Sequence, residues 1–308
     1  MGEYAVNIAS KATSPSLKLK NKLMDSGFRL ACWSAAILLF STLMMLILFV
    51  GKTGLQVFDT VSPSEFFLSF DWVPEEELFG AASMIAGTFM LTGLSLLISI
   101  PISLAMAAFN AVICPPWLRK YTRPILDTLV GIPSVVYGYI GLTVLIPLVR
   151  QVTGELMGDG LLVAALVLAF MVLPTIARIS DDALSALPKE YMEAAYALGA
   201  TKTHIIWTIL IPAARNGIAT AVVLGMARAI GETMAVVMVI GNVAQLPDGL
   251  FTPTAVLTSN IVSQIMNVPF DSTWNYALYM MAFLLLLISL ALIALINMIR
   301  QEEGGART

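Results

Sequence analysis

The sequence predicts an all-α membrane protein with six transmembrane helices and both termini in the cytoplasm. Its composition is the first reason: 58% of the 308 residues are hydrophobic and only 12% are charged, whereas soluble domains contain about 25% charged residues. The mean hydropathy is +0.86. The second reason is that several apolar stretches reach the ~20 residues needed to cross a bilayer core. They lie at about 28–50, 81–109, 124–149, 161–177, 213–240 and 276–299.

The basic residues predict how these spans are oriented, because cytoplasmic loops carry an excess of lysine and arginine. All but three of the 17 basic residues fall near the two termini or in the loops that follow the second and fourth spans. The exceptions are Lys52 and Arg150 in predicted outer loops and Arg228 inside the fifth span. We therefore expect both termini, including the tail at 301–308, on the cytoplasmic side.

The chain divides into a first helix with its flanking segments at 1–80, a five-helix core at 81–300 and the tail. The first apolar stretch is too long for a signal peptide and no cleavage site follows it, so we expect it to remain as a helix. The outer loop after this helix is acidic, and we expect its carboxylates to be solvated. They are Asp59, Glu65, Asp71, Glu75, Glu76 and Glu77.

Prolines and glycines interrupt the remaining spans and loops. Pro101, Pro133 and Pro147 are expected to kink or break helices. Residues 241–275 contain Gly, Pro and Asn between apolar stretches too short to span, which favours a segment that dips into the outer half of the bundle. Whether this segment is a gate or a surface cap is left open by the sequence.

The longest predicted cytoplasmic loop, residues 178–212, has the pattern of two short helices joined by a glycine. Four apolar residues at helical spacing form one face: Tyr191, Ala194, Ala195 and Leu198. Gly199 fits a helix C-cap, and a second amphipathic segment runs from about 203 to 211. Periodicity alone favours a docking element no more than an amphipathic connector lying on the membrane.

The stretch "EAAYALGATKTHIIWTILIP", residues 193–212, resembles the EAA signature of ABC importer permeases. Ile211 stands where that signature has a leucine before the proline. The resemblance implies the type I ABC importer permease fold in the cytoplasmic (inner) membrane, as a multi-pass protein. It also implies a coupling helix that docks onto a separate ATP-binding subunit. The matching residues are Glu193, Ala194, Ala195 and Gly199.

The chain is not expected to be an enzyme or to hold a cofactor itself. Its only match to a phosphate-binding loop is "GKT" at 51–53, and the glycine that such a loop requires five residues earlier is replaced by Leu46. We therefore expect ATP and Mg²⁺ to bind to the partner ATPase subunit. No spacing of catalytic or metal-ligating residues indicates a catalytic or metal site.

The fifth predicted span contains two charged residues, Arg228 and Glu232, in "ARAIGETMAV". A charge in the bilayer centre costs at least a few kcal/mol, and residues four apart share one helix face. In one interpretation the two residues form a structural ion pair. In the other, the arginine contacts an anion on a translocation path, because a guanidinium suits a tetrahedral oxyanion, and the glutamate holds the arginine and keeps the anion from binding too tightly.

Three stretches extend the resemblance from about residue 81 onward: "GIPSVVYGYIGL", "LPKEYMEAAYALGAT" and "GMARAIGETMAVVMVIGN". They are similar to the PstC family, the permease subunits of phosphate ABC importers. This resemblance implies that Arg228 and Glu232 lie on the phosphate path. Ser134 and Tyr137 are candidates for hydroxyls on the same path, although helix packing is their default role. The implied partners are a PstA-like second permease subunit, two PstB-like ATP-binding subunits and a PstS-like extracytoplasmic phosphate-binding protein.

Other transporter classes remain as alternatives. A permease for another oxyanion, such as molybdate or sulfate, would keep the coupling loop but is expected to lack the stretch from Arg228 to Asn242. A secondary transporter or channel would not need the EAA signature and often shows inverted repeats. A membrane sensor without transport would share the fold. The presence of both motifs favours the phosphate importer.

Overall fold

The computed structural model describes residues 15–154 and 157–305, and these form two compact units that divide between Val50 and Gly51. The predicted cytoplasmic segment at 1–14 and the end of the predicted tail at 306–308 lie outside the described residues. Residues 51–80, grouped with the first helix in the sequence analysis, belong to the unit that contains the core.

The first unit consists of helix α1, Pro15–Leu55, whose last residues continue into the second unit. Its apolar side chains face outward along most of the helix: Leu39 and Met45, for example, are 73% and 74% exposed. Such a surface is compatible with lipid but not with water. The predicted first span is therefore a helix of sufficient length and hydropathy, within Ser26–Asp59.

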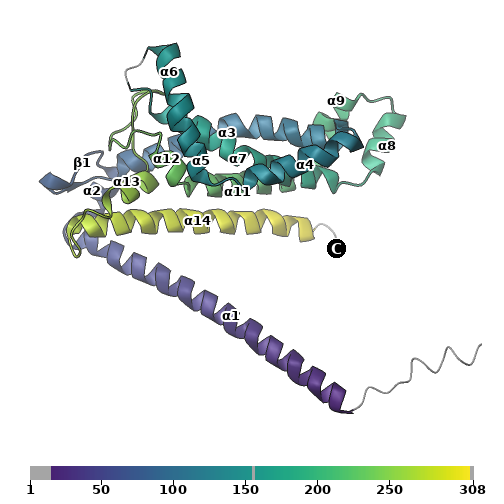
Figure 1. The fold of residues 1–308 in the computed structure, drawn as a ribbon, viewed down its shortest axis with the longest axis horizontal. Coiled ribbons are helices and arrows are strands. Elements are labelled where there is room, and N and C mark those ends of the chain that lie inside the picture. The colour runs from purple at the N-terminus through teal and green to yellow at the C-terminus, as the bar shows by residue number, and fades with distance from the viewer. Residues whose placement is uncertain (1–14, 155–156, 306–308) are drawn as a thin grey trace, which may run out of the picture. The chain divides into compact units, whose positions relative to one another are not determined.

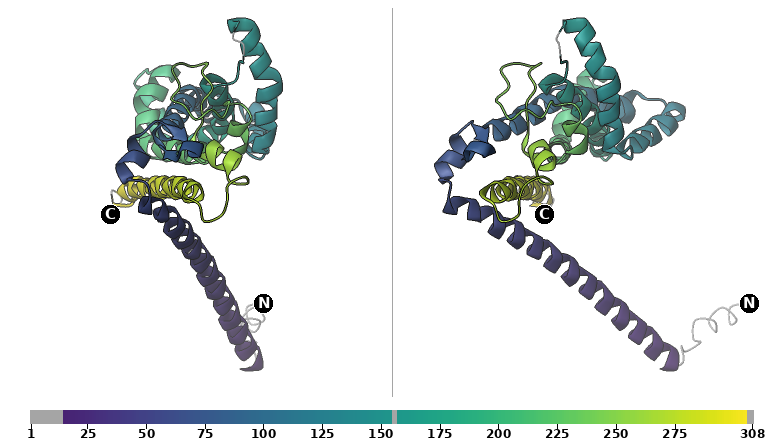
Figure 2. Two further views of the ribbon diagram at one scale, coloured as in Figure 1. Left: turned by 90° about the vertical axis from the view of Figure 1, so that its left-hand side faces the viewer. Right: turned by 60° about the vertical axis from the view of Figure 1, so that its left-hand side comes forward.

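The second unit is a helical bundle in which α3, α7 and α11 run side by side and α14 packs along α11 (Figures 1 and 2). The long helices are α3 (Ala82–Ala108), α4 (Pro116–Val130), α7 (Leu161–Ser185), α11 (Arg215–Ile230) and α14 (Thr273–Gly305). The shorter helices are α2 (Pro63–Leu68), α5 (Ser134–Ile140), α6 (Ile146–Thr153), α8 (Glu190–Ala197), α9 (Lys202–His204), α10 (Ile211–Ala213), α12 (Met234–Val237) and α13 (Leu257–Gln264). Wider π-type turns occur at Phe109–Ile113, Gly141–Leu145 and Ile205–Leu210.

Among the described residues, five helices are long and apolar enough to cross a membrane, and a bent pair can supply a sixth. All five overlap a predicted span, and the fourth span continues to Ser185 rather than ending at 177. The third begins at Ser134 rather than 124, because α4 ends at Val130 and Pro133 disfavours helix in the residue before it. Pro101 lies inside α3 without ending the helix.

The prediction of one continuous fifth span, 213–240, is wrong. Residues Lys202–Ala213 and Arg215–Ile230 are bent by 75° relative to each other. The helix then ends at Ile230, and only the short α12 follows. Gly231 lowers helix stability at this point. Backbone that leaves the helix at membrane depth must be covered by protein or line a cavity.

Small polar residues on α3 allow it to pack closely against α7. Ser95, Ser99 and Ser103 recur on one face and are fully buried, and Ser103 Oγ donates a hydrogen bond to the Leu173 carbonyl at 3.0 Å. Small side chains at membrane helix contacts let the backbones approach. On α11, an added Cβ at Gly225 would come within 2.6 Å of the Ile176 side chain, so any larger residue would have to displace it.

The end of the bundle opposite to α8 is covered by a small hairpin and by re-entrant backbone (Figure 1). Strands β1 (Trp72–Val73) and β2 (Leu78–Phe79) pair antiparallel in the acidic segment, a local departure from an all-α fold. The carboxylates of this segment are exposed, as predicted.

Thr254 and Ser259 in the predicted dipping segment are fully buried, and the Leu257 amide donates to Thr88 Oγ1 of α3 at 3.1 Å. The dip into the bundle is thereby confirmed.

Candidate translocation site and coupling surface

Arg228 lies in the last turn of α11, where three elements meet. Its Nη1 donates a hydrogen bond to Thr175 Oγ1 of α7 at 2.8 Å. Its Nη2 donates to the carbonyl of Val130, the last residue of α4, at 3.4 Å. A cation is favoured at a helix C-terminus because carbonyl groups there lack intrahelical partners. The neutral partners orient the guanidinium but do not neutralise it.

The expected ion pair between Arg228 and Glu232 is not formed. Glu232 lies beyond the end of α11, and its Oε1 accepts a hydrogen bond from the Ala235 amide at 3.0 Å, at the start of α12. The rule that residues four apart face each other requires a continuous helix, which the break at Gly231 removes. The Glu232 carbonyl in turn accepts from Thr258 Oγ1 of α13 at 3.0 Å.

This arrangement leaves Arg228 with spare capacity for a ligand. The side chain is half-buried and forms no salt bridge with any carboxylate in the described part of the chain. A guanidinium has five N–H donors, and the two contacts above do not use all of them. Because an unpaired cation at membrane depth is costly, an anion that reaches this point would be attracted to it.

The two candidate hydroxyls of α5 have different surroundings. The Tyr137 hydroxyl donates to the Leu129 carbonyl at 3.1 Å and so fixes the turn between α4 and α5. Its ring lines an apolar cavity of about 390 Å³, together with Phe170 and Pro174. Ser134 is half-buried in the first turn of α5. An apolar cavity is unsuited to an anion and the Tyr137 hydroxyl binds a backbone carbonyl here, so a contact of either hydroxyl with the anion stays a prediction.

The predicted coupling helix is α8, which projects at one end of the bundle (Figure 1). Ala195 is 5% exposed and packs among Ile205, Ile206 and Leu210, in a cluster that also includes the ends of α3 and α7. Glu193 and Ala194 are exposed. The predicted apolar face is therefore split, with Ala195 turned inward and the other residues outward. A largely uncovered apolar helix surface is suited to a protein partner.

Gly199 ends α8 as predicted. Its φ is +79°, a conformation that L-residues with side chains adopt only at a cost. The Ala200 amide donates to the Ala195 carbonyl at 3.1 Å, and the Gly199 amide donates to the Tyr196 carbonyl at 2.9 Å. This pair of bonds is a Schellman motif. It turns the chain sharply and leaves open space where a Cβ would be.

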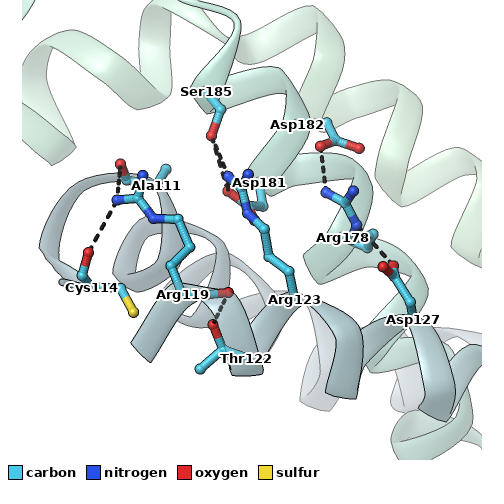
Figure 3. Close-up of polar contacts among 10 residues, drawn as sticks. All are labelled: Ala111, Cys114, Arg119, Thr122, Arg123, Asp127, Arg178, Asp181, Asp182 and Ser185. Atoms are coloured by element: carbon cyan, nitrogen blue, oxygen red, sulfur yellow. Dashed lines mark hydrogen bonds and ion pairs between the residues drawn. The ribbon is translucent and has the colours of Figure 1, made fainter. Parts of the chain in front are cut away.

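A group of ion pairs joins α4 to α7 and was not identified from the sequence (Figure 3). Arg123 binds Asp181 in a bidentate manner, with Nε–Oδ2 and Nη2–Oδ1 both at 2.8 Å, and also donates to Ser185 Oγ. Asp181 is fully buried. Arg178 pairs with Asp127 at 2.9 Å and with Asp182. We call these five charged residues the α4–α7 ion-pair cluster.

Only part of this cluster has a signal in the sequence. Arg178 and Asp182 are four residues apart, as helical ion pairs are, but Arg178 was assigned to a loop. Asp127 lies in α4, 51 residues from its partner Arg178, and no local pattern predicts that pair. Arg123 and Asp181 are separated by 58 residues, so only the tertiary structure brings them together.

The first testable prediction concerns this cluster. Arg123→Ala is expected to lower the free energy of unfolding by about 3 kcal/mol, because the buried Asp181 carboxylate would keep only Ser185 as a partner. The expected value is at the low end of the range for broken buried pairs, since Arg123 is 29% exposed. Denaturant unfolding in detergent measures the change. Lys120→Ala, at an exposed position on the same helix, is the control, and equal stability of the two variants would contradict the prediction.

The chain is similar to known membrane transport proteins over most of its length. A family model, described as binding-protein-dependent transport system inner membrane component, matches residues 99–302. The chain is 42% identical over 273 residues to the probable ABC transporter permease protein YqgH of Bacillus subtilis (strain 168), covering 87% of this chain and 88% of that protein. It is 33% identical over 292 residues to the phosphate transport system permease protein PstC of Pasteurella multocida (strain Pm70), covering 86% and 91%.

Solved structures share the fold at low sequence identity. A bacterial ABC transporter involved in the import of the acidic polysaccharide alginate superposes with a TM-score of 0.61 at 16% identity, covering 91% of this chain and 99% of that chain. An inward-facing MetNI methionine ABC transporter gives a TM-score of 0.52 at 24% identity, covering 69% and 93%.

Proposed function

The chain belongs to the family of binding-protein-dependent transport system inner membrane components, which makes it a permease subunit of an ABC importer, and we propose that the imported ion is phosphate. One observation supports this most directly: Arg228 is oriented by Thr175 and Val130 but has no carboxylate partner among the described residues. Relatives that cover most of the chain are phosphate permeases by name, from Pasteurella multocida and Xylella fastidiosa among others.

Arg228 is proposed to contact phosphate on the translocation path. A guanidinium presents paired donors that match two oxygens of a tetrahedral anion. Glu232 lies just past the helix break and supplies negative charge in the same region, so the anion would be held only weakly. An ion that must leave after each cycle requires weak binding of this kind.

The coupling helix is proposed to link this site to ATP hydrolysis in other subunits. Exposed Glu193 and Ala194 would contact a PstB-like subunit that binds ATP and Mg²⁺, while buried Ala195 would pass the motion to the ends of α3 and α7. Ser185 ends α7 near the coupling helix, and Thr175 lies on the same helix about 15 Å away, at a rise of ~1.5 Å per residue. Because Thr175 orients Arg228, a displacement of α7 would reach the anion site directly.

The remaining partners follow from the same proposal. A PstA-like subunit would complete the path, because the described part of the core exposes many apolar side chains that a second permease subunit would cover. A PstS-like protein would deliver phosphate to the outer end, near the β-hairpin and residues 241–275. The permease would expose this end and the cytoplasmic end alternately.

Anion competition tests the proposed substrate. Cells that lack their own phosphate importers, and express the chain with its cognate subunits, are expected to accumulate radiolabelled phosphate. Arsenate has the same shape and charge, so an excess of it is expected to inhibit uptake, whereas sulfate and molybdate are not. Inhibition by sulfate or molybdate with no effect of arsenate would assign the permease to another oxyanion.

A further inference from the structure

A partly polar pocket lies behind the coupling helix, away from Arg228. Its volume is about 280 Å³. It is formed where the π-type turn after α3 (Phe109–Ile113) and the last turn of α7 meet α4 and the start of α8. The lining residues are Ala111, Val112, Arg119, Leu184, Ser185, Leu187, Pro188, Lys189, Met192 and Leu210. Arg228 of the proposed path, and Glu193 and Ala194 on the exposed face of the coupling helix, do not line this pocket.

The pocket is at the level expected for lipid headgroups. The stretches of sufficient length and hydropathy to cross a membrane end at Ile113 and Ser185, and residues next to both ends line the pocket. On α4, Trp117 and Tyr121 are 69% and 58% exposed. Exposed aromatic residues at the ends of spans are typical of the membrane–water interface. The basic residues around this end indicate the cytoplasmic leaflet.

The pocket contains positive charge that the protein does not neutralise. Arg119 Nη2 donates to the carbonyls of Ala111 at 3.2 Å and Cys114 at 3.1 Å, but its Nε is buried without a hydrogen-bond partner (Figure 3). Neither Arg119 nor Lys189 forms a salt bridge with any carboxylate within residues 26–154 and 157–298. The nearby carboxylate of Asp181 is already paired with Arg123.

We propose that this pocket binds the phosphate group of an anionic phospholipid from the cytoplasmic leaflet. Basic pockets between membrane helices on this side suit anionic headgroups. Arg119 and Lys189 supply the charge, and Val112, Leu184 and Leu210 supply an apolar wall for the first part of the acyl chains. Free phosphate has the same anionic chemistry but would not use that wall. The bound lipid would contact Met192 of the coupling helix, and this inference does not depend on which ion is transported.

Lipid retention by the assembled complex tests the proposal. Phosphatidylglycerol is titrated into the complex in a zwitterionic lipid background, and bound lipid is counted by native mass spectrometry. Lys189→Gln is expected to weaken binding about fivefold, since one cation near an anionic headgroup has an effect of this size. Lys120→Gln removes the same charge from an exposed position outside the pocket and is expected to have little effect.

A second variant and a second ligand make the test decisive. Arg119→Gln is expected to weaken lipid binding at least as much, but Arg119 also holds two carbonyls, so Lys189→Gln is the cleaner variant. Equal retention by wild type and both variants would overturn the proposal. Inorganic phosphate is titrated in a parallel arm. Phosphate binding that is lost in Lys189→Gln, without any lipid effect, would reassign the pocket to the free ion and overturn the lipid assignment.

Discussion

Arg228→Gln is expected to lower phosphate uptake by about 100-fold while the permease still assembles with its ATP-binding subunits. Glutamine can keep a hydrogen bond to Thr175 but carries no positive charge. A hydrogen bond to a charged group contributes ~1.5–3 kcal/mol, and 2.7 kcal/mol corresponds to about 100-fold. Uptake of radiolabelled phosphate by cells measures the effect, with expression level and ATP hydrolysis followed in parallel.

Two further variants show whether the charge itself is responsible. Arg228→Lys keeps the charge but loses the paired donors, and intermediate uptake is expected. Arg150→Gln removes a positive charge from an exposed position in α6 and is expected to transport normally. Normal uptake by Arg228→Gln would show that the arginine is only a structural link between α11, α7 and α4.

Ala194→Trp is expected to prevent binding of the ATP-binding subunit without unfolding the permease. Ala194 is exposed on α8, so the larger side chain has space within the chain itself but blocks the close approach of a partner. Co-purification of the ATP-binding subunit and phosphate uptake are both expected to fall to background. The unfolding transition of the permease measures whether the chain remains folded.

Neighbouring alanines provide matched comparisons for this variant. Ala195 is buried against Ile205 and Leu210, so Ala195→Trp is expected to destabilise the permease itself by overpacking. Ala186 is exposed between α7 and α8, and Ala186→Trp is expected to assemble normally. If Ala194→Trp retained both the ATP-binding subunit and transport, the exposed face of α8 would not be the docking surface.

Much of the fold was predictable because span length and hydropathy are local properties of the sequence. The apolar stretches located the helices within Ser26–Asp59, Ala82–Ile113, Leu161–Ser185 and Thr273–Met298. The break before Ser134 was predicted from Pro133. Hydropathy does not record backbone geometry, so the break near Gly231 was missed. The extension of α7 beyond 177 was missed for a related reason: Arg178, Asp181 and Asp182 look like loop residues until their ion pairs are known.

In the candidate site, too, features set by neighbouring residues were predictable, whereas contacts between helices were not. The C-cap at Gly199 and the short helix before it depend on a few neighbouring residues and were predicted correctly. The pairing of Arg228 with Glu232 was predicted wrongly, because it assumed an unbroken helix. The actual partners of Arg228 are Thr175 and the Val130 carbonyl, 53 and 98 residues away, and no periodicity within one helix identifies a contact between two helices.

ATP-driven accumulation of phosphate by the reconstituted complex tests the central claim most directly. The chain is purified with its second permease subunit and ATP-binding subunits, placed in proteoliposomes, and supplied with the phosphate-binding protein outside and ATP inside. The account predicts accumulation of labelled phosphate against its gradient, which requires ATP and is lost in Arg228→Gln. Accumulation without ATP, or no phosphate transport by a complex that imports another anion, would contradict it.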